Sequence, residues 1–286
     1  MSDYRDLSAG LAARMALEKY GFRFSHSLGQ NFILDDGLVR RIVEAAEVWP
    51  GERVLEIGPG AGVMTRCLAE QGARVTAVEL DKSLEPVLSA VLAGYDVRFV
   101  FEDILKVDLA GLMGDEPFSV VANLPYYITA DVVLRLLTGA RKPDRITIMV
   151  QKEAAGRMMA RPNTKTWCAL AATAQYFGQI EPLMELPPSA FTPSPHVDSV
   201  LLGIRLYDGK PFEAKDEALL LKVIAAAFAM RRKTLANNLT AAFSVSRETA
   251  LAWIGALGLD ERVRGEALSI EELCRLSDII GEARGK

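Results

Sequence analysis

One glycine-rich turn constrains the fold of this chain more than any other stretch of its sequence. Residues 54–57, Val-Leu-Glu-Ile, favour a buried strand, and Gly58, Gly60 and Gly62 follow at alternate positions. An apolar periodic segment begins at Val63, so the pattern predicts a strand, a tight turn and a helix. Glycines let backbone approach a ligand where a Cβ would collide, and the helix start adds unpaired N–H groups. The stretch therefore predicts a ligand site at the end of a buried strand.

Two acidic residues around this turn indicate the kind of ligand. Glu79 ends the next apolar strand, 21 residues after Gly58, which is about the spacing of a ribose-binding acid in a nucleotide-binding βαβ unit. Dinucleotide-binding turns place the third glycine three residues after the second, whereas Gly62 follows Gly60 by two. With Glu56 before the first glycine, the pattern E-x-G-x-G-x-G resembles the first motif of S-adenosylmethionine (SAM)-dependent methyltransferases. The alternative is a tight strand–helix turn without a ligand, and the distant Glu79 argues against it.

Composition excludes several other classes of protein. With 286 residues we expect one large and one small domain. The absence of a long apolar run and the charged N-terminus predict a cytoplasmic protein without a membrane segment or a secretory signal. The three cysteines are scattered and only two histidines accompany them, so we expect neither a metal site nor a histidine-based triad. The net charge of −4 argues mildly against nucleic acid, but phosphates respond to local basic clusters.

Strands and helices alternate as far as residue 206, which predicts a mostly parallel, doubly wound α/β sheet with ligands at the carboxyl ends of its strands. Four residues come at such ends and should form one rim: Gly58, Glu79, Asp103 and Asn123. The strands expected after the first two are 97–101, 118–122, 146–150 and 199–206. The helices expected around them are 9–20, 36–47, one from residue 83, 130–137, 151–159 and 167–177.

From residue 207 the composition changes. A linker with Gly209 and Pro211 precedes a segment that reads as helices only, at 216–230, 233–243, 247–257 and 269–281. We therefore expect a sheet domain over residues 1–206 and a small all-α domain over residues 207–286.

The segment Asn123-Leu124-Pro125-Tyr126 resembles the [DNS]-x-P-[YFW] signature of methyltransferases that modify planar amino or amide nitrogens. An amine conjugated to a purine is a poor nucleophile because its lone pair is delocalised into the ring. The Asn123 side-chain oxygen and the carbonyl of Leu124 can accept its two N–H bonds, which directs the lone pair at a methyl donor. Tyr126 offers an aromatic face for the base. A plain turn is the alternative, and the position after the fourth strand argues against it.

Two further features point to a nucleic-acid substrate. Phe191 lies in a proline-rich loop and would form a second aromatic wall, although it can also anchor the loop to the core. Arg231, Arg232 and Lys233 form the densest basic cluster of the helical segment. Such a run is often a solvated face, but nearby threonine and asparagine side chains favour an RNA contact.

Together these motifs resemble, in identity and order, the ribosomal RNA adenine-N6,N6-dimethyltransferases, over about residues 25–275, with the bacterial small-subunit (16S) rRNA enzymes the nearest in pattern. The resemblance implies a Rossmann-like SAM-binding catalytic domain, a helical RNA-recognition domain, and SAM as the cofactor. The motifs that carry it are 27–32 (Ser-Leu-Gly-Gln-Asn-Phe), 56–62, 123–126, 151–153 (Gln-Lys-Glu), 191–199 (Phe-Thr-Pro-Ser-Pro-His-Val-Asp-Ser) and 231–235 (Arg-Arg-Lys-Thr-Leu). The cofactor contacts that it implies are Asn31, the backbone at Ile33, Gly58, Gly60, Glu79, Asp103 and Asn123.

Two positions depart from the family pattern. Ile33 stands where leucine is usual, which a backbone contact should survive. Ser27 stands where a basic residue is common, so the resemblance does not imply an RNA contact at this position.

The resemblance implies an enzyme that dimethylates two adjacent adenosines near the 3′ end of 16S rRNA and acts in small-subunit assembly, as a monomer. One alternative is a large-subunit rRNA adenine methyltransferase of the erythromycin-resistance type, against which the full 191–199 motif and the basic cluster argue. The other is an assembly or nucleic-acid-binding factor that keeps the fold without catalysis, against which Glu79, Asp103, Asn123 and Tyr126 argue.

Overall fold

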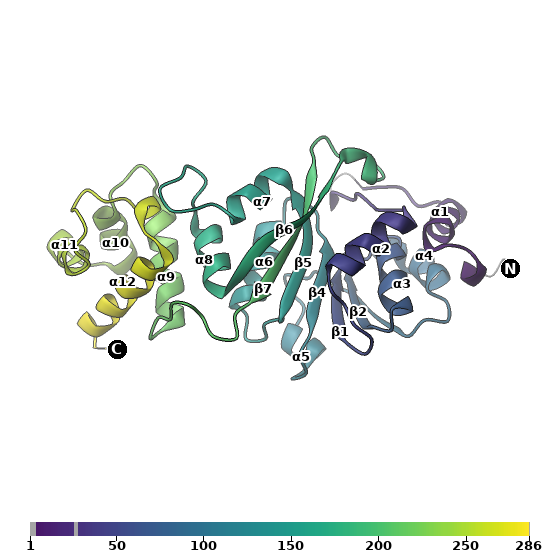
Figure 1. Ribbon diagram of the computed structural model, residues 1–286, viewed down its shortest axis with the longest axis horizontal. Coiled ribbons are helices and arrows are strands. Elements are labelled where there is room, and N and C mark those ends of the chain that lie inside the picture. Colours follow the sequence, from purple (N-terminus) through teal and green to yellow (C-terminus); the bar gives the residue numbers. More distant parts are fainter. Residues whose placement is uncertain (1–3, 26–27, 286) are drawn as a thin grey trace. The chain divides into compact units, whose positions relative to one another are not determined.

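The computed structural model describes residues 4–25 and 28–285, which form two compact units (Figure 1). The first unit comprises the described residues of Met1–Ala155 together with Glu181–Leu206. The second comprises Gly156–Ile180 and the described part of Tyr207–Lys286. Among the described residues no helix is long and apolar enough to cross a membrane.

A seven-stranded sheet with the order β3-β2-β1-β4-β5-β7-β6 organises the first unit. β1 to β5 are all parallel to one another, and β7 runs antiparallel to β5. The order reverses direction between β1 and β4, which makes their carboxyl ends the switch point where open α/β sheets bind ligands. The strands are β1 Arg53–Ile57, β2 Arg74–Glu79, β3 Val97–Phe101, β4 Ser119–Asn123, β5 Arg145–Gln151, β6 Gly178–Leu186 and β7 Ser199–Leu206.

The central strands are buried on both faces, as their continuous apolar sequences require. Val54, Val120 and Ile146 illustrate this, since each lies in a different strand and is fully buried. Helices cover both faces of the sheet (Figure 1) because each parallel crossover returns the chain through a helix. The helices of this region are α1 Ala9–Lys19, α2 Asp36–Ala45, α3 Val63–Glu70, α4 Glu85–Val91, α5 Leu109–Met113, α6 Thr129–Thr138 and α7 Lys152–Met158, with 3₁₀ turns at Tyr4–Asp6, Lys82–Leu84 and Pro188–Ala190.

The second unit is helical, as the composition after residue 206 predicts. It differs from the expected division because residues 156–180 belong to it rather than to the sheet unit, so the boundaries between the units fall inside α7 and near the start of β6. Trp167 explains the difference: its side chain is fully buried, donates from Nε1 to the carbonyl of Leu268 at 3.0 Å, and packs edge-on against Phe228. The helices are α8 Ala169–Phe177, α9 Glu217–Ala229, α10 Leu235–Phe243, α11 Arg247–Ala256 and α12 Ile270–Ala283, with a 3₁₀ turn at Gly265–Ala267.

Most expected elements are found within one to three residues of their predicted ends, but β6 and the short α5 are not foreseen. β6 carries Pro182 and is rich in exposed polar side chains. Proline is tolerated only where a strand edge lacks a hydrogen-bonding neighbour, and β6 is the outer strand of the sheet.

Candidate active site

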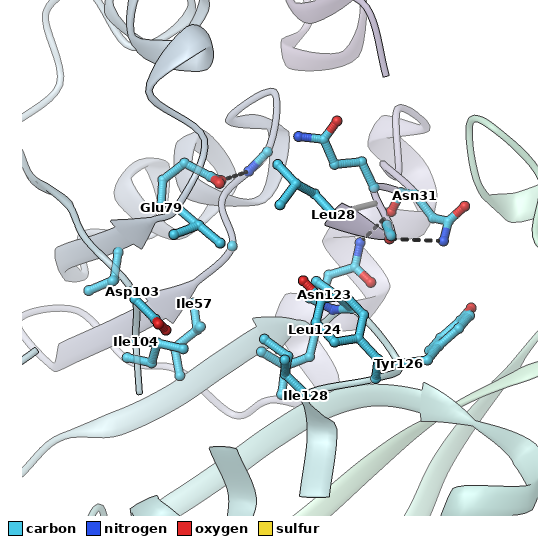
Figure 2. A pocket seen from close by; sticks show the side chains of 18 of the residues that line it. Leu28, Asn31, Ile57, Glu79, Asp103, Ile104, Asn123, Leu124, Tyr126 and Ile128 are labelled. Atoms are coloured by element: carbon cyan, nitrogen blue, oxygen red, sulfur yellow. Dashed lines mark hydrogen bonds between the residues drawn. The ribbon is translucent and has the colours of Figure 1, made fainter. Parts of the chain in front are cut away.

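A cavity opens at the carboxyl ends of β1, β2 and β4 (Figure 2). Its floor is apolar and its rim carries carboxylate and amide groups. The residues expected from sequence that line it are Asn31, Gly58, Gly60, Glu79, Asp103, Asn123, Leu124 and Tyr126.

The glycine turn and Glu79 form one side of the cavity. Glu79 accepts hydrogen bonds from the backbone N–H of Gly60 at 3.2 Å and of Asp81 at 2.9 Å. Gly58 and Gly60 both have positive φ, at 72° and 55°. A Cβ built at Gly60 would lie 2.8 Å from the Phe32 ring, so a side chain there would displace the wall of the site. The turn therefore needs glycine for its backbone angle and for the close approach of Phe32.

The environment of Glu79 suits it to accept hydroxyl groups. Its side chain is buried, and burial raises its pKa, while the backbone hydrogen bonds favour the charged form. A carboxylate has about four acceptor positions, so two backbone bonds leave capacity for a ligand. Asp103 provides a second acid on the same rim, with one oxygen held by the backbone N–H of Leu105 at 2.9 Å. Two acids separated by the apolar side chains of Ile57 and Ile104 suit a nucleoside.

Asn123 is held in one orientation by the chain. Its Nδ2 donates to the backbone carbonyl of Asn31 at 2.7 Å, and Asn31 Nδ2 donates in turn to the carbonyl of Gly29 (dashed lines in Figure 2). Because a carbonyl can only accept, this bond fixes which end of the Asn123 amide is the nitrogen. The Oδ1 acceptor is thereby left for a ligand in the cavity.

Residues 28–32 form a strap that crosses the cavity from the β2 side to the β4 side. Gln30 Nε2 donates to Asp81 at 2.7 Å, beyond β2, while the Asn31 carbonyl receives Asn123, at the end of β4. Phe32 exchanges two backbone hydrogen bonds of 2.8 Å with Thr192, which joins the strap to the proline-rich loop. Three motifs that are far apart in sequence thus meet at one site. Ser27, at the start of the first motif, lies outside the described residues.

Several residues of the cavity wall carry no individual sequence signal. Leu28 and Gln30 belong to a motif in which only the asparagine is expected to contact the cofactor, and Leu80 and Tyr127 each follow an expected residue. Leu80 and Tyr127 are half or more exposed at the rim, where a large apolar side chain is informative. Their position next to Glu79 and Tyr126 is the signal that would have found them.

Two expected residues are not part of this cavity's wall. Phe191 is buried, with 4 % of its surface exposed, and packs in the core cluster with Phe32 and Leu186. This matches the alternative in which it anchors the proline-rich loop. Ile33 lines a smaller neighbouring cavity, which shares Phe32, Gly58, Gly60 and Asn123 with the main one.

Glu56 of the glycine motif lies behind the site, fully buried in β1. Neither of its carboxylate oxygens has a hydrogen-bond partner within the part of the chain that the structure describes. Burial raises the pKa of Glu56 to about 8; the neighbouring Thr65 hydroxyl acts in the opposite direction, and the Glu79 charge adds to the rise. Glu56 is therefore mostly protonated at neutral pH.

The basic cluster lies in the helical unit, between α9 and α10, and all three side chains are exposed. Arg231 donates to the backbone carbonyl of Lys165 at 2.6 Å and pairs with Glu266 at 3.5 Å. Within residues 4–25 and 28–285 the structure records no side-chain partner for Arg232 or Lys233. These two cations are the ones that remain available to an external anion.

The doubly wound sheet brings together the motifs that resemble those of SAM-dependent methyltransferases. They are the glycine turn after β1, the acid at the end of β2 and the Asn-x-Pro-Tyr turn after β4.

Comparison with known proteins narrows this class. The model of a family described as ribosomal RNA adenine dimethylase matches residues 21–282. The "Ribosomal RNA small subunit methyltransferase A" of Alkaliphilus metalliredigens is 41 % identical over 91 % of this chain and 93 % of its own length. The chain therefore belongs to the ribosomal RNA adenine dimethylase family.

Solved structures show the same fold. A dimethyladenosine transferase from Plasmodium falciparum superimposes with a TM-score of 0.73 at 21 % identity, covering 88 % of this chain and 97 % of the other, and shares the fold. The 23S rRNA methyltransferase ErmE superimposes with a TM-score of 0.65 at 26 % identity, covering 87 % and 99 %.

Proposed function

We propose that this chain transfers methyl groups from SAM to N6 of two adjacent adenosines near the 3′ end of small-subunit (16S) rRNA, as a cytoplasmic monomer that acts during small-subunit assembly. The observation that carries the proposal is the fixed amide of Asn123, whose oxygen has no hydrogen-bond partner among the described residues and whose side chain lines the same cavity as Glu79 and Asp103. The helical unit, with its exposed basic cluster, supplies an RNA contact.

The residues of the cavity fit the cofactor. Glu79 would accept the ribose hydroxyls, Asp103 the amine of the cofactor's adenine, and Ile57 and Ile104 would pack on its ring. Asn31, the glycine turn and the backbone at Ile33 would contact the remainder of the cofactor. When bound there, SAM supplies an electrophilic methyl group.

The chain's own contribution to chemistry is to position the target amine. Asn123 Oδ1 and the carbonyl of Leu124 accept the two N–H bonds, which favours a pyramidal nitrogen with its lone pair directed at the methyl group. Tyr126 stacks on the adenine ring. The nitrogen does not need to lose its proton before transfer, so no histidine base is required.

The small-subunit substrate is favoured over the large-subunit one by similarity. The small-subunit relative is 41 % identical to this chain, whereas ErmE is 26 % identical.

A direct test incubates the protein with SAM and either small-subunit precursor particles or large-subunit rRNA, then maps N6,N6-dimethyladenosine by mass spectrometry. Two adjacent modified adenosines near the 3′ end of the small-subunit RNA are expected. Modification of the large-subunit RNA alone would refute the substrate assignment.

Replacing Glu79 tests the cofactor site. Glu79→Ala should weaken SAM binding by about 1–3 kcal/mol, the range for a lost charged hydrogen-bond partner. Because Glu79 also holds the N–H of Gly60, Glu79→Gln is a useful comparison that keeps an acceptor at the turn, and it should lose less. Calorimetric titration of SAM measures both, and thermal unfolding verifies the fold. Wild-type affinity in a folded Glu79→Ala protein would remove this residue from the site.

The basic cluster is tested by the salt dependence of RNA binding. If Arg232 and Lys233 contact phosphates, the variant with both changed to Gln should bind RNA more weakly. Its plot of log affinity against log salt should be shallower by roughly 0.7–0.9 per lost contact. Lys215→Gln is a matched control, because Lys215 is exposed on the same unit but paired with Glu282. A salt slope equal to that of the wild type would assign the cluster to a solvated surface.

A further inference from the structure

A hydrogen bond links Tyr126 to the last residue of the proline-rich motif. The Tyr126 hydroxyl lies 2.9 Å from Ser199 Oγ, although the two residues are 73 positions apart in sequence. Ser199 is fully buried at the start of β7, whereas Tyr126 is half-buried and lines the cavity. The contact therefore joins a side chain of the site to a side chain of the scaffold.

The two ends of this contact differ in how firmly they are held. Tyr126 belongs to the turn after β4, whose backbone is free of the sheet ladder. Ser199 is in register with Gln151 of β5, inside the sheet. A ring whose hydroxyl is hydrogen-bonded to a side chain of the sheet has less freedom to tilt, and a stacking surface is effective only when its plane is held. A serine hydroxyl carries one donor and two acceptor positions, so it can serve the phenol in either direction.

We propose that Ser199 is a positioning residue that fixes the plane of the Tyr126 ring against the target adenine. This inference rests on the proposed function, in which Tyr126 stacks on that base. It gives the terminal serine of the 191–199 motif a role in the site, whereas Phe191 at the other end of the motif anchors it to the core. The motif thus connects the core to the ring that receives the substrate.

Three variants isolate the hydrogen bond. Ser199→Ala and Tyr126→Phe each remove this hydrogen bond and leave the aromatic ring in place. The double variant loses the same single bond. Ser199→Thr keeps the hydroxyl. Ser277→Ala is a matched control, because Ser277 is equally buried but its hydroxyl has no partner within the described residues. The measurement is the single-turnover rate of adenine methylation at saturating SAM and saturating RNA, with SAM affinity and thermal unfolding in parallel.

Each single variant should slow methyl transfer by about three- to tenfold, the range for one neutral hydrogen bond, and leave SAM affinity unchanged. The double variant should be no slower than the slower single one, because both changes remove the same contact. Ser199→Thr and Ser277→Ala should stay within about twofold of the wild-type rate.

The proposal is overturned if Tyr126→Phe reacts at the wild-type rate, or if the two losses multiply in the double variant. It is also overturned if Ser199→Ala lowers only the unfolding temperature. Any of these results leaves the proposed function standing as long as the wild-type protein dimethylates adenine. A wild-type protein that transfers no methyl group to adenine N6 would refute the proposed function itself.

Discussion

Asn123→Ala is expected to reduce the rate of methyl transfer on the order of 10²–10³-fold, by analogy with the loss of one preorganised group at a site of developing charge. The reason is that the Asn123 oxygen acts mainly in the transition state, when the amine becomes pyramidal and its N–H groups become stronger donors. The bond from Nδ2 to the Asn31 carbonyl orients the amide before substrate arrives, so the wild-type residue needs no reorganisation.

Single-turnover methylation at saturating SAM and saturating RNA measures this effect apart from binding. RNA affinity should fall much less than the rate, and some SAM affinity will be lost because Asn123 lines the cofactor cavity. Glu79→Ala gives the contrast under the same conditions: it should recover most of its rate once SAM saturates. Near-wild-type dimethylation by Asn123→Ala would show that the amine is positioned by other groups.

Glu56→Gln is expected to stabilise the ligand-free protein at neutral and alkaline pH. The pKa of Glu56 rises from its usual 4.5 to about 8 on folding. Below pH 4.5 both states are protonated and the residue contributes nothing to the pH dependence. Between the two pKa values only the unfolded state loses its proton, so the free energy of unfolding falls by about 1.4 kcal/mol per pH unit. At pH 7 this cost amounts to about 3 kcal/mol, and glutamine removes it.

Urea unfolding of both proteins between pH 5 and pH 8.5 tests this expectation. The difference in stability should be smallest at pH 5, at about 1 kcal/mol, and should grow as the pH rises and level off near pH 8. Glu44→Gln, which changes an exposed acid on α2, controls for the loss of one carboxylate. A difference between wild type and Glu56→Gln that does not change with pH would mean that Glu56 is not a buried, protonated acid.

The sequence predicts the parts of this fold that depend on local periodicity. β3 and β7 begin and end at the predicted residues, and the helices of the second unit are within a few residues of their expected bounds. The rim of the site was predictable for a related reason. In a parallel sheet the carboxyl ends of neighbouring strands meet, so Gly58, Glu79, Asp103 and Asn123 had to be close once their strands were identified.

Features that depend on distant contacts were not predictable in this way. The bond from Asn123 to Asn31, like the one from Tyr126 to Ser199, joins residues whose distance in sequence carries no periodic signal. From the sequence, Phe191 fits both a base-stacking residue and an anchor, and its burial in the core cluster is a feature that periodicity does not predict. β6 was missed because an edge strand is exposed and tolerates Pro182, so it lacks the apolar alternation that identifies strands.

The division of the chain at residues 156–180 has a consequence for how the helical unit can be exchanged between proteins. Trp167 fills the interior of that unit, against Phe228 and the carbonyl of Leu268, yet it precedes the last two strands of the sheet in sequence. A cut after residue 206 would therefore remove the surroundings of a fully buried tryptophan and leave it facing water. Replacing only the segment after residue 206 with that of another protein is therefore disfavoured. A graft of the helical unit must therefore replace residues 156–180 and the segment from residue 207 together.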